Sequence, residues 1–226
     1  MKIGILMTGH AVPEVLPTLG AYDAFFARLL DGHGFEYAVY DCEGGVIPDS
    51  PEECDGWLIT GSKHGAYEAH DWIPPLEQFI RACYDAQVPM IGVCFGHQVI
   101  AQAMGGKVEK FAGGWSVGPV DYAMDSETVT INAWHQDQVV AKPAMAAVIA
   151  KTDFCANAGL IYGDTFWTIQ PHPEYDHDYI DGLITYRGKG VVPEPQLAAA
   201  KAKQNTPLDR TRMADHMRAF FMKERT

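Results

Sequence analysis

Short apolar runs alternate with helix-period segments over the first hundred residues of this chain. The runs Lys2–Met7, Phe35–Tyr40, Gly56–Thr60 and Met90–Val93 are rich in apolar residues and are predicted as strands. Between them, apolar residues recur at helical spacing, as from Leu76 to Tyr84. This alternation is typical of a parallel sheet with helices on both faces, so we expect an α/β fold with a mostly parallel open sheet.

The second half of the chain has a different pattern. From residue 107 to about residue 170, short strand-like runs, including Glu127–Ile131 and Thr165–Gln170, are separated by Gly and Pro. This pattern predicts a small antiparallel extension of the sheet. Residues 188–195 are expected to form a loop, and Arg210–Lys223 a final amphipathic helix.

Size, charge and cysteine content narrow the class of protein. With 226 residues, 47% of them apolar, the chain can bury one large core, and we expect a single domain spanning residues 1–226. A net charge of −12 repels phosphate backbones and anionic lipids, so neither nucleic acid nor membrane is an expected partner. The 5 cysteines contain no C-x-x-C pair, which argues against a disulfide framework or a thiolate zinc site and favours a cytoplasmic location.

The strongest chemical signal is a G-x-C-x-G motif at residues 92–96, with Cys94 at its centre. It joins a predicted strand to Phe95–Met104, which has helical periodicity. A nucleophile on such a turn stands above the sheet, and the helix N-terminus favours its thiolate form. Cys94 is therefore the candidate nucleophile, although a buried structural cysteine between two packing glycines would give the same pattern.

Two further segments supply partners for a cysteine nucleophile. His172 and Glu174, two apart in an extended Q-P-H-P-E segment, can project together as a base and the acceptor that orients it. The glycine-rich turn after Gly56–Thr60 can point the Gly61 N–H into a cleft as half of an oxyanion hole, with the Phe95 N–H as the other half. Taken alone, each has a plainer interpretation, a solvated loop histidine or an ordinary turn.

These three elements, in this order, resemble the class I glutamine amidotransferases, whose pattern is a strand-end glycine loop, G-x-C-x-G-x-Q and a distant H-P-E. The resemblance covers about residues 1–185 and implies the flavodoxin-like fold of that family. It also implies a catalytic triad and an oxyanion hole, which in this sequence are Cys94, His172 and Glu174, with the N–H groups of Gly61 and Phe95.

The resemblance extends to residues that would bind substrate. It implies that Gln98 contacts the glutamine moiety and that the backbone around His135 and Gln136 binds its amino acid end. His135 is then near the substrate rather than a rival base, although a structural role is equally compatible with the sequence.

Other polar residues near the motifs are assigned no chemistry. His97, one helical turn after the nucleophile, is expected to pack or to support a loop. Asp176, His177 and Asp178 could form a metal cluster with His172, but adjacent residues at a helix start point in different directions. We expect neither a metal site nor a cofactor.

The chain has no G-x-x-x-x-G-K-[ST] motif, so it resembles the stand-alone family members that are similar to the glutaminase domain of GMP synthase. The implied function is hydrolysis of the γ-amide of glutamine or another γ-glutamyl compound through a γ-glutamyl thioester. Two alternatives stay open: a glutaminase subunit that delivers ammonia to a synthetase partner, and a catalytically silent binding or regulatory module. A homo-oligomer is also compatible with the sequence.

Overall fold

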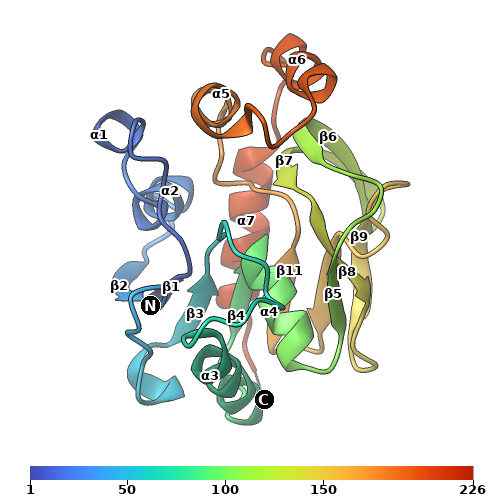
Figure 1. The fold of residues 1–226 in the computed structure, drawn as a ribbon. Coiled ribbons are helices and arrows are strands. Elements are labelled where there is room, and N and C mark those ends of the chain that lie inside the picture. Colours follow the sequence, from blue (N-terminus) through green and yellow to red (C-terminus); the bar gives the residue numbers. More distant parts are fainter. Residues whose placement is uncertain (226) are drawn as a thin grey trace.

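The computed structural model describes residues 1–225, which form one large sheet flanked by helices (Figure 1). The strands are β1 (Lys2–Met7), β2 (Glu36–Asp41), β3 (Gly56–Ile59), β4 (Met90–Val93), β5 (Lys107–Lys110), β6 (Ser116–Met124), β7 (Glu127–His135), β8 (Asp137–Ala141), β9 (Ala147–Lys151), β10 (Gly159–Tyr162) and β11 (Phe166–Ile169). The helices are α1 (Leu16–Leu19), α2 (Tyr22–Leu29), α3 (Ile73–Asp85), α4 (Phe95–Ala103), α5 (His177–Leu183), α6 (Glu194–Ala202) and α7 (Arg210–Phe221). Two short helical turns complete the set, η1 (Pro51–Glu53) and η2 (Ile184–Gly188).

The main sheet has a parallel half and an antiparallel half. Within residues 1–225 its strand order is β2-β1-β3-β4-β11-β10-β9-β6-β7, and β5 pairs separately with β8. The first five strands in this order run parallel to one another. The remaining four are antiparallel. The predicted α/β class, with a mostly parallel sheet and an antiparallel extension, is confirmed.

One strand lies at the boundary between the two halves of the sheet. The run Thr165–Gln170 was expected in the antiparallel extension, and β11 does pair antiparallel with β10. Its other neighbour, however, is β4, to which it runs parallel, with Ile169 opposite Val93. All four residues of each of these strands are buried, which is what a central position covered on both faces requires. The consequence is that the carboxyl ends of β4 and β11 lie next to each other.

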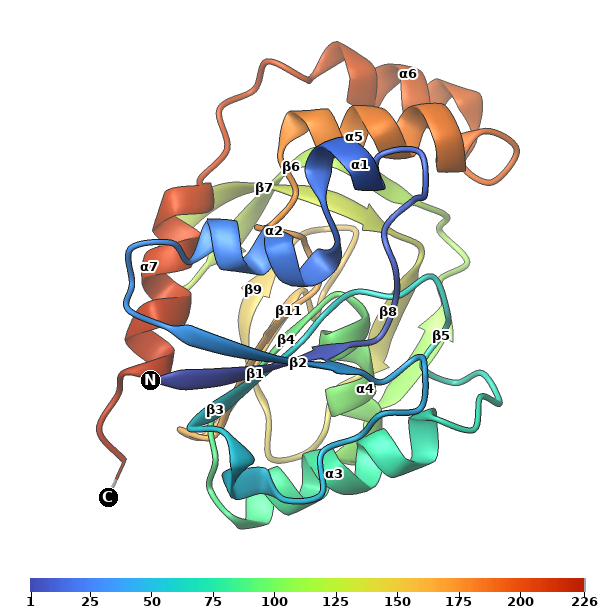
Figure 2. The ribbon, with the colours of Figure 1, turned by 90° about the vertical axis from the view of Figure 1, so that its left-hand side faces the viewer.

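Helices cover both faces of the parallel half, with α2 and α7 on one side and α3 and α4 on the other (Figure 2). Ile5 of β1 shares an apolar cluster with Phe26 of α2 and Phe221 of α7. The next residue, Leu6, points the other way and belongs to a cluster with Leu76 of α3. Within residues 1–225 no helix combines the length and apolar character needed to cross a membrane.

The segment between β11 and α7 is more helical than the sequence analysis predicted. The loop expected at 188–195 ends at Pro193, where α6 begins, and α5 and η2 precede it. Of the residues of α6, only Leu197 and Ala200 are buried, so its sequence carries little apolar periodicity. These helices pack against Trp134 and cover one end of the sheet.

The turn between β4 and α4 requires glycine on both sides of Cys94. Cys94 has φ 54° and ψ −104°, a region that side chains other than glycine rarely adopt. A Cβ added at Gly92 would lie 2.6 Å from the Gly96 carbonyl oxygen, and one added at Gly96 would overlap the Ile59 carbonyl oxygen. Strand β3, strand β4 and helix α4 therefore meet at van der Waals distance around the cysteine.

This close approach predicts that Gly96→Ala destabilises the protein by about 1–3 kcal/mol, because the new methyl group meets rigid backbone. Gly56→Ala is the matched control, since a Cβ there would meet Phe221 side-chain carbons at 3.1 Å, which can move. Urea unfolding measures both variants. Equal free energies of unfolding for the two would contradict the packing described for the turn.

Candidate active site

A cavity of about 280 Å³ opens at the carboxyl ends of the parallel strands. Open α/β sheets bind ligands at this edge, because the loops that follow neighbouring strands converge there. Cys94 follows β4, His172 follows β11, and the loop that follows β3 contributes residues 62–65. Of the residues predicted from the sequence, those whose side chains line the cavity are Cys94, Gln98, His135, Gln136 and His172.

Cys94 occupies the N-cap position of α4. Its own N–H donates to the Ile169 carbonyl oxygen at 2.9 Å, which ties the nucleophile turn to β11. The positive end of the α4 dipole therefore points at this residue. The side chain is only 6% exposed, so the thiol meets the cavity rather than bulk solvent.

His172 and Glu174 form a buried pair. Nδ1 of His172 lies 2.6 Å from Oε1 of Glu174, and each side chain is 2% exposed. The His172 N–H donates to the Asn132 carbonyl oxygen at 2.8 Å, and Arg210 donates to the Glu174 carbonyl oxygen at 3.3 Å. Because Nδ1 pairs with the carboxylate, Nε2 is the ring nitrogen that can interact with Cys94.

The charges around His172 favour its protonated form. Burial by itself lowers the pKa of His172, but the Glu174 carboxylate and the Cys94 side chain, which also hydrogen-bonds the ring, raise it to about 10. The imidazole is therefore protonated at neutral pH beside the Cys94 side chain. Such a pair suits a cysteine nucleophile, because the proton is already on the group that must deliver it.

The Gly61 and Phe95 N–H groups border Cys94 from two sides. Phe95 is the first residue of α4, and a Cβ added at Gly61 would lie 3.8 Å from the Cys94 Cβ and 2.9 Å from Cε1 of His172. In the described part of the chain neither N–H donates to a protein acceptor. Both N–H groups can therefore donate a hydrogen bond to an oxyanion, and only glycine fits at position 61 without displacing the His172 ring.

The three residues predicted to bind substrate are held by hydrogen bonds of their own. The Gln98 amide nitrogen donates to the Asp137 carbonyl oxygen at 3.0 Å and to Gln170 Oε1 at 3.1 Å. Gln136 Nε2 donates to the Phe111 carbonyl oxygen at 3.3 Å. These bonds fix the turn between β7 and β8 as one wall of the cavity.

His135 and His97 differ from His172 in their charge. Burial lowers the pKa of His135 to about 4, and the nearby His172 charge adds to this effect. Burial likewise lowers the pKa of His97 to about 3. His97 is fully buried and its Nδ1 lies 2.8 Å from Thr168 Oγ1, so it has the packing role that was predicted. Neither ring is charged at neutral pH.

Tyr175 is a site residue that the sequence analysis missed. Its ring is stacked on the His172 imidazole, with centroids 3.9 Å apart and planes 6° apart. The stacking fixes the plane of the His172 imidazole. The only sequence signal for Tyr175 was its position directly after the H-P-E segment. Asp176 and His177, the alternative metal ligands, point elsewhere: Asp176 caps α5 through the Tyr179 N–H, and His177 Nε2 contacts the Thr206 carbonyl oxygen.

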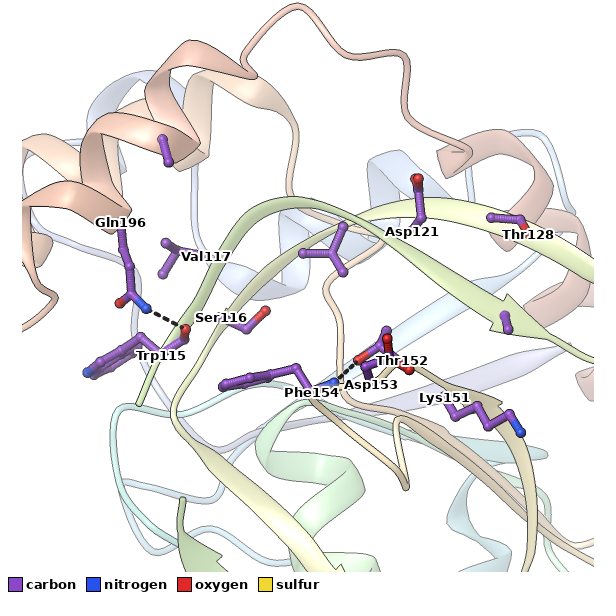
Figure 3. Close-up of a pocket in the computed structure, with 13 residues that line it drawn as sticks. Trp115, Ser116, Val117, Asp121, Thr128, Lys151, Thr152, Asp153, Phe154 and Gln196 are labelled. Carbon is purple, nitrogen blue, oxygen red and sulfur yellow. Dashed lines mark hydrogen bonds between the residues drawn. The ribbon is translucent and has the colours of Figure 1, made fainter. Parts of the chain in front are cut away.

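A second, wider groove of about 640 Å³ lies over strands β6, β7 and β9 beside α6 (Figure 3). Gln196 donates to the Trp115 carbonyl oxygen at 3.2 Å at one end, and Phe154 lines its floor. No cysteine or histidine is among the residues that line it. Trp115 also borders the Cys94 cavity, but the chemistry described above lies in that smaller cavity alone.

Comparison with known proteins agrees with this geometry. The sequence model of the family "Glutamine amidotransferase class-I" matches residues 33–186. Gamma-glutamyl peptidase 4 of Arabidopsis thaliana is 31% identical over 183 residues, which are 74% of this chain and 73% of that protein. GMP synthase of Pseudomonas entomophila is 31% identical over 150 residues, 58% of this chain but only 27% of that longer protein.

A solved structure shows the same fold. A glutamine amidotransferase from Methylobacillus flagellatus superimposes with a TM-score of 0.78 over 100% of this chain and 96% of that one, at 21% identity. The family match covers well over half of the sequence. The chain therefore belongs to the class I glutamine amidotransferase family.

Proposed function

We propose that this protein hydrolyses the γ-amide bond of a γ-glutamyl compound through a γ-glutamyl thioester on Cys94. The observation that supports the proposal best is the buried His172–Glu174 pair facing Cys94 in the cavity. Relatives named gamma-glutamyl peptidases favour a γ-glutamyl compound as the substrate. Glutamine itself belongs to the same class of compounds.

In the first half of the reaction, the Cys94 thiolate attacks the γ-carbonyl carbon and forms a C–S bond. The carbonyl oxygen gains negative charge, which the N–H groups of Gly61 and Phe95 stabilise. The tetrahedral intermediate collapses when the C–N bond breaks, and His172 gives its proton to the leaving amine. The products are a free amine and the thioester.

In the second half, the neutral His172 accepts a proton from water as the water oxygen attacks the thioester carbonyl. The C–S bond then breaks, releasing glutamate and regenerating the thiolate beside a protonated His172. Glu174 holds the ring orientation and stabilises its positive charge in both halves.

Charged groups in the cavity suit the free ends of a glutamyl group. Lys110 and Arg187 line the cavity of a chain whose net charge is −12, and within residues 1–225 neither forms an ion pair. They attract substrate carboxylates. Backbone carbonyl groups near His135 and Gln136 are suited to accept hydrogen bonds from the α-amino group.

Two other functions are alternatives: a glutaminase subunit would use the same catalytic residues, and a silent module would use none of them. As a glutaminase subunit, the protein would hand the ammonia to a synthetase partner, a role favoured by the match to GMP synthase. A catalytically silent module is disfavoured by the intact Cys94, His172 and Glu174. Hydrolysis of γ-glutamyl dipeptides by the isolated chain would separate the hydrolase from both alternatives. Hydrolysis of glutamine would exclude only the silent module, because a glutaminase subunit cleaves glutamine as well.

Substrate recognition predicts that γ-glutamyl-p-nitroanilide is cleaved, and that N-acetylation of its amino group lowers kcat/KM by about tenfold to a hundredfold. A polar group that loses its partner in a buried site costs about 1–3 kcal/mol. Release of p-nitroaniline measures both substrates, with Cys94→Ser as the inactive control. Equal turnover of the acetylated and free forms would indicate a general cysteine amidase instead.

The assigned roles predict that His172→Ala loses more activity than Glu174→Gln. Loss of the base should lower kcat by at least about a thousandfold. In Glu174→Gln the side-chain oxygen can still accept a hydrogen bond from the His172 ring, so more activity should remain. His216→Ala on the exposed face of α7 is the matched histidine control and should retain wild-type kcat. A His172→Ala enzyme with wild-type kcat would rule out the triad.

Cys94 is predicted to react with iodoacetamide before the other four cysteines. Burial raises the pKa of Cys42 and of Cys155 to about 12, and it also raises the pKa of Cys54 and of Cys83. Cys94 is the cysteine that lines the active-site cavity. Peptide mass mapping after brief labelling measures the order, and earlier labelling of Cys155 with activity retained would contradict the nucleophile assignment.

A further inference from the structure

Three metal-binding side chains converge in the loop between β3 and α3. His64, Glu68 and His70 each offer a ligand atom, and these atoms all lie within 4.8 Å of one another. Nδ1 of His64 is 3.4 Å from Oε2 of Glu68, and Nε2 of His70 is 2.8 Å from the same oxygen. Bonds of 2.0–2.1 Å in a tetrahedral zinc site place neighbouring ligand atoms about 3.3 Å apart. The two separations from Glu68 lie close to that value, and the two histidine nitrogens lie within 4.8 Å of each other.

The Glu43 carboxylate contacts one ring nitrogen of His64 and leaves the other, Nδ1, to act as a metal ligand. Nε2 of His64 lies 3.0 Å from Oε1 of Glu43, which also pairs with Lys63 at 3.1 Å. If Nε2–H donates to Glu43, Nδ1 carries a lone pair and faces the Glu68 oxygen. Two acceptors at 3.4 Å repel each other unless a proton or a metal cation lies between them. A histidine ligand whose other nitrogen donates to a carboxylate is the usual arrangement around protein-bound zinc.

The remaining ligands are also held in place by their surroundings. The His70 ring is stacked on Trp72, with planes 19° apart, and its centroid lies 4.1 Å from that of His64. The Glu68 N–H donates to the Gly65 carbonyl oxygen at 3.0 Å, and the His70 N–H donates to the Glu68 carbonyl oxygen at 3.0 Å. The turns therefore bring the three side chains together before any ligand binds.

We propose that His64 Nδ1, Glu68 and His70 Nε2 bind a divalent transition metal ion, with Zn²⁺ as the ion that fits the ligands best. Two imidazoles and one carboxylate suit zinc, and such three-ligand sets leave a fourth position for water or a substrate group. The sequence analysis expected no metal site and did not consider the segment H-x-x-x-E-x-H, which lies in a loop and matches no helical or paired-cysteine pattern.

The proposed site lies at the active-site cavity. His64 and Glu68 line that cavity together with Cys94, and the loop that carries them begins at Gly61. Only two residues separate Gly61 from His64, so an ion bound here would restrain the segment that supplies an oxyanion N–H. The fourth coordination position would face compounds that enter the cavity. This inference concerns metal binding and does not depend on the proposed amide hydrolysis.

The test is a calorimetric titration of untagged Cys94→Ser protein with Zn²⁺. The serine removes the catalytic thiolate, which could itself bind zinc beside His172. One Zn²⁺ per chain is expected, and His70→Ala or Glu68→Gln should weaken binding by at least about tenfold. Glu43→Gln, which leaves all three ligands present, should also weaken it by about tenfold to a hundredfold.

His216→Ala in the same background is the control for general histidine binding and should leave the affinity unchanged. Thermal melts establish that each variant is folded, which is expected because His70 and Glu68 are partly exposed. Absence of saturable Zn²⁺ binding would overturn the proposal. It would indicate instead that a doubly protonated His64 bridges Glu43 and Glu68 without a metal ion. Zinc affinity equal in all variants would overturn it as well.

Discussion

The strained turn at Cys94 is the constraint on which the rest of the site depends. A residue other than glycine held at φ 54° and ψ −104° costs on the order of 1–3 kcal/mol, and the surrounding structure must supply that energy. It does so through burial of both faces of β4, the bond from the Cys94 N–H to Ile169, and the contact of Gly96 with β3. The parallel sheet thereby fixes the position of the thiol, and α4 places the positive end of its helix dipole next to it.

The second constraint is the burial of the His172–Glu174 pair. Charged side chains that are only 2% exposed lose most of their hydration, so they are stable only when each meets a partner. Glu174 meets His172, and the pair is clamped from outside by Arg210 on α7 and by the stacked Tyr175. Elements far apart in the chain thus hold one imidazole in one plane, as a positioned base requires.

The fold class and the central residues could be predicted from the sequence because both leave local signals. The runs at Lys2–Met7 and Met90–Val93 match β1 and β4 residue for residue, and the cysteine and histidine motifs lie at strand ends. The position of β11 could not be predicted, since a four-residue buried run does not reveal its neighbours. Helix α6 was missed because it buries few apolar residues, and the convergence of His64 and His70 depends on turns that no periodicity describes.

The electrostatic partners of His172 also explain how one side chain can serve both halves of the proposed reaction. Burial lowers its pKa, but the Glu174 carboxylate and the Cys94 side chain together raise it. Formation of the thioester would replace the thiolate by a neutral sulfur, while burial and Glu174 stay unchanged. The pKa of His172 would therefore fall once the amine has taken its proton. The acid of the first step would become the base of the second without any movement of the ring.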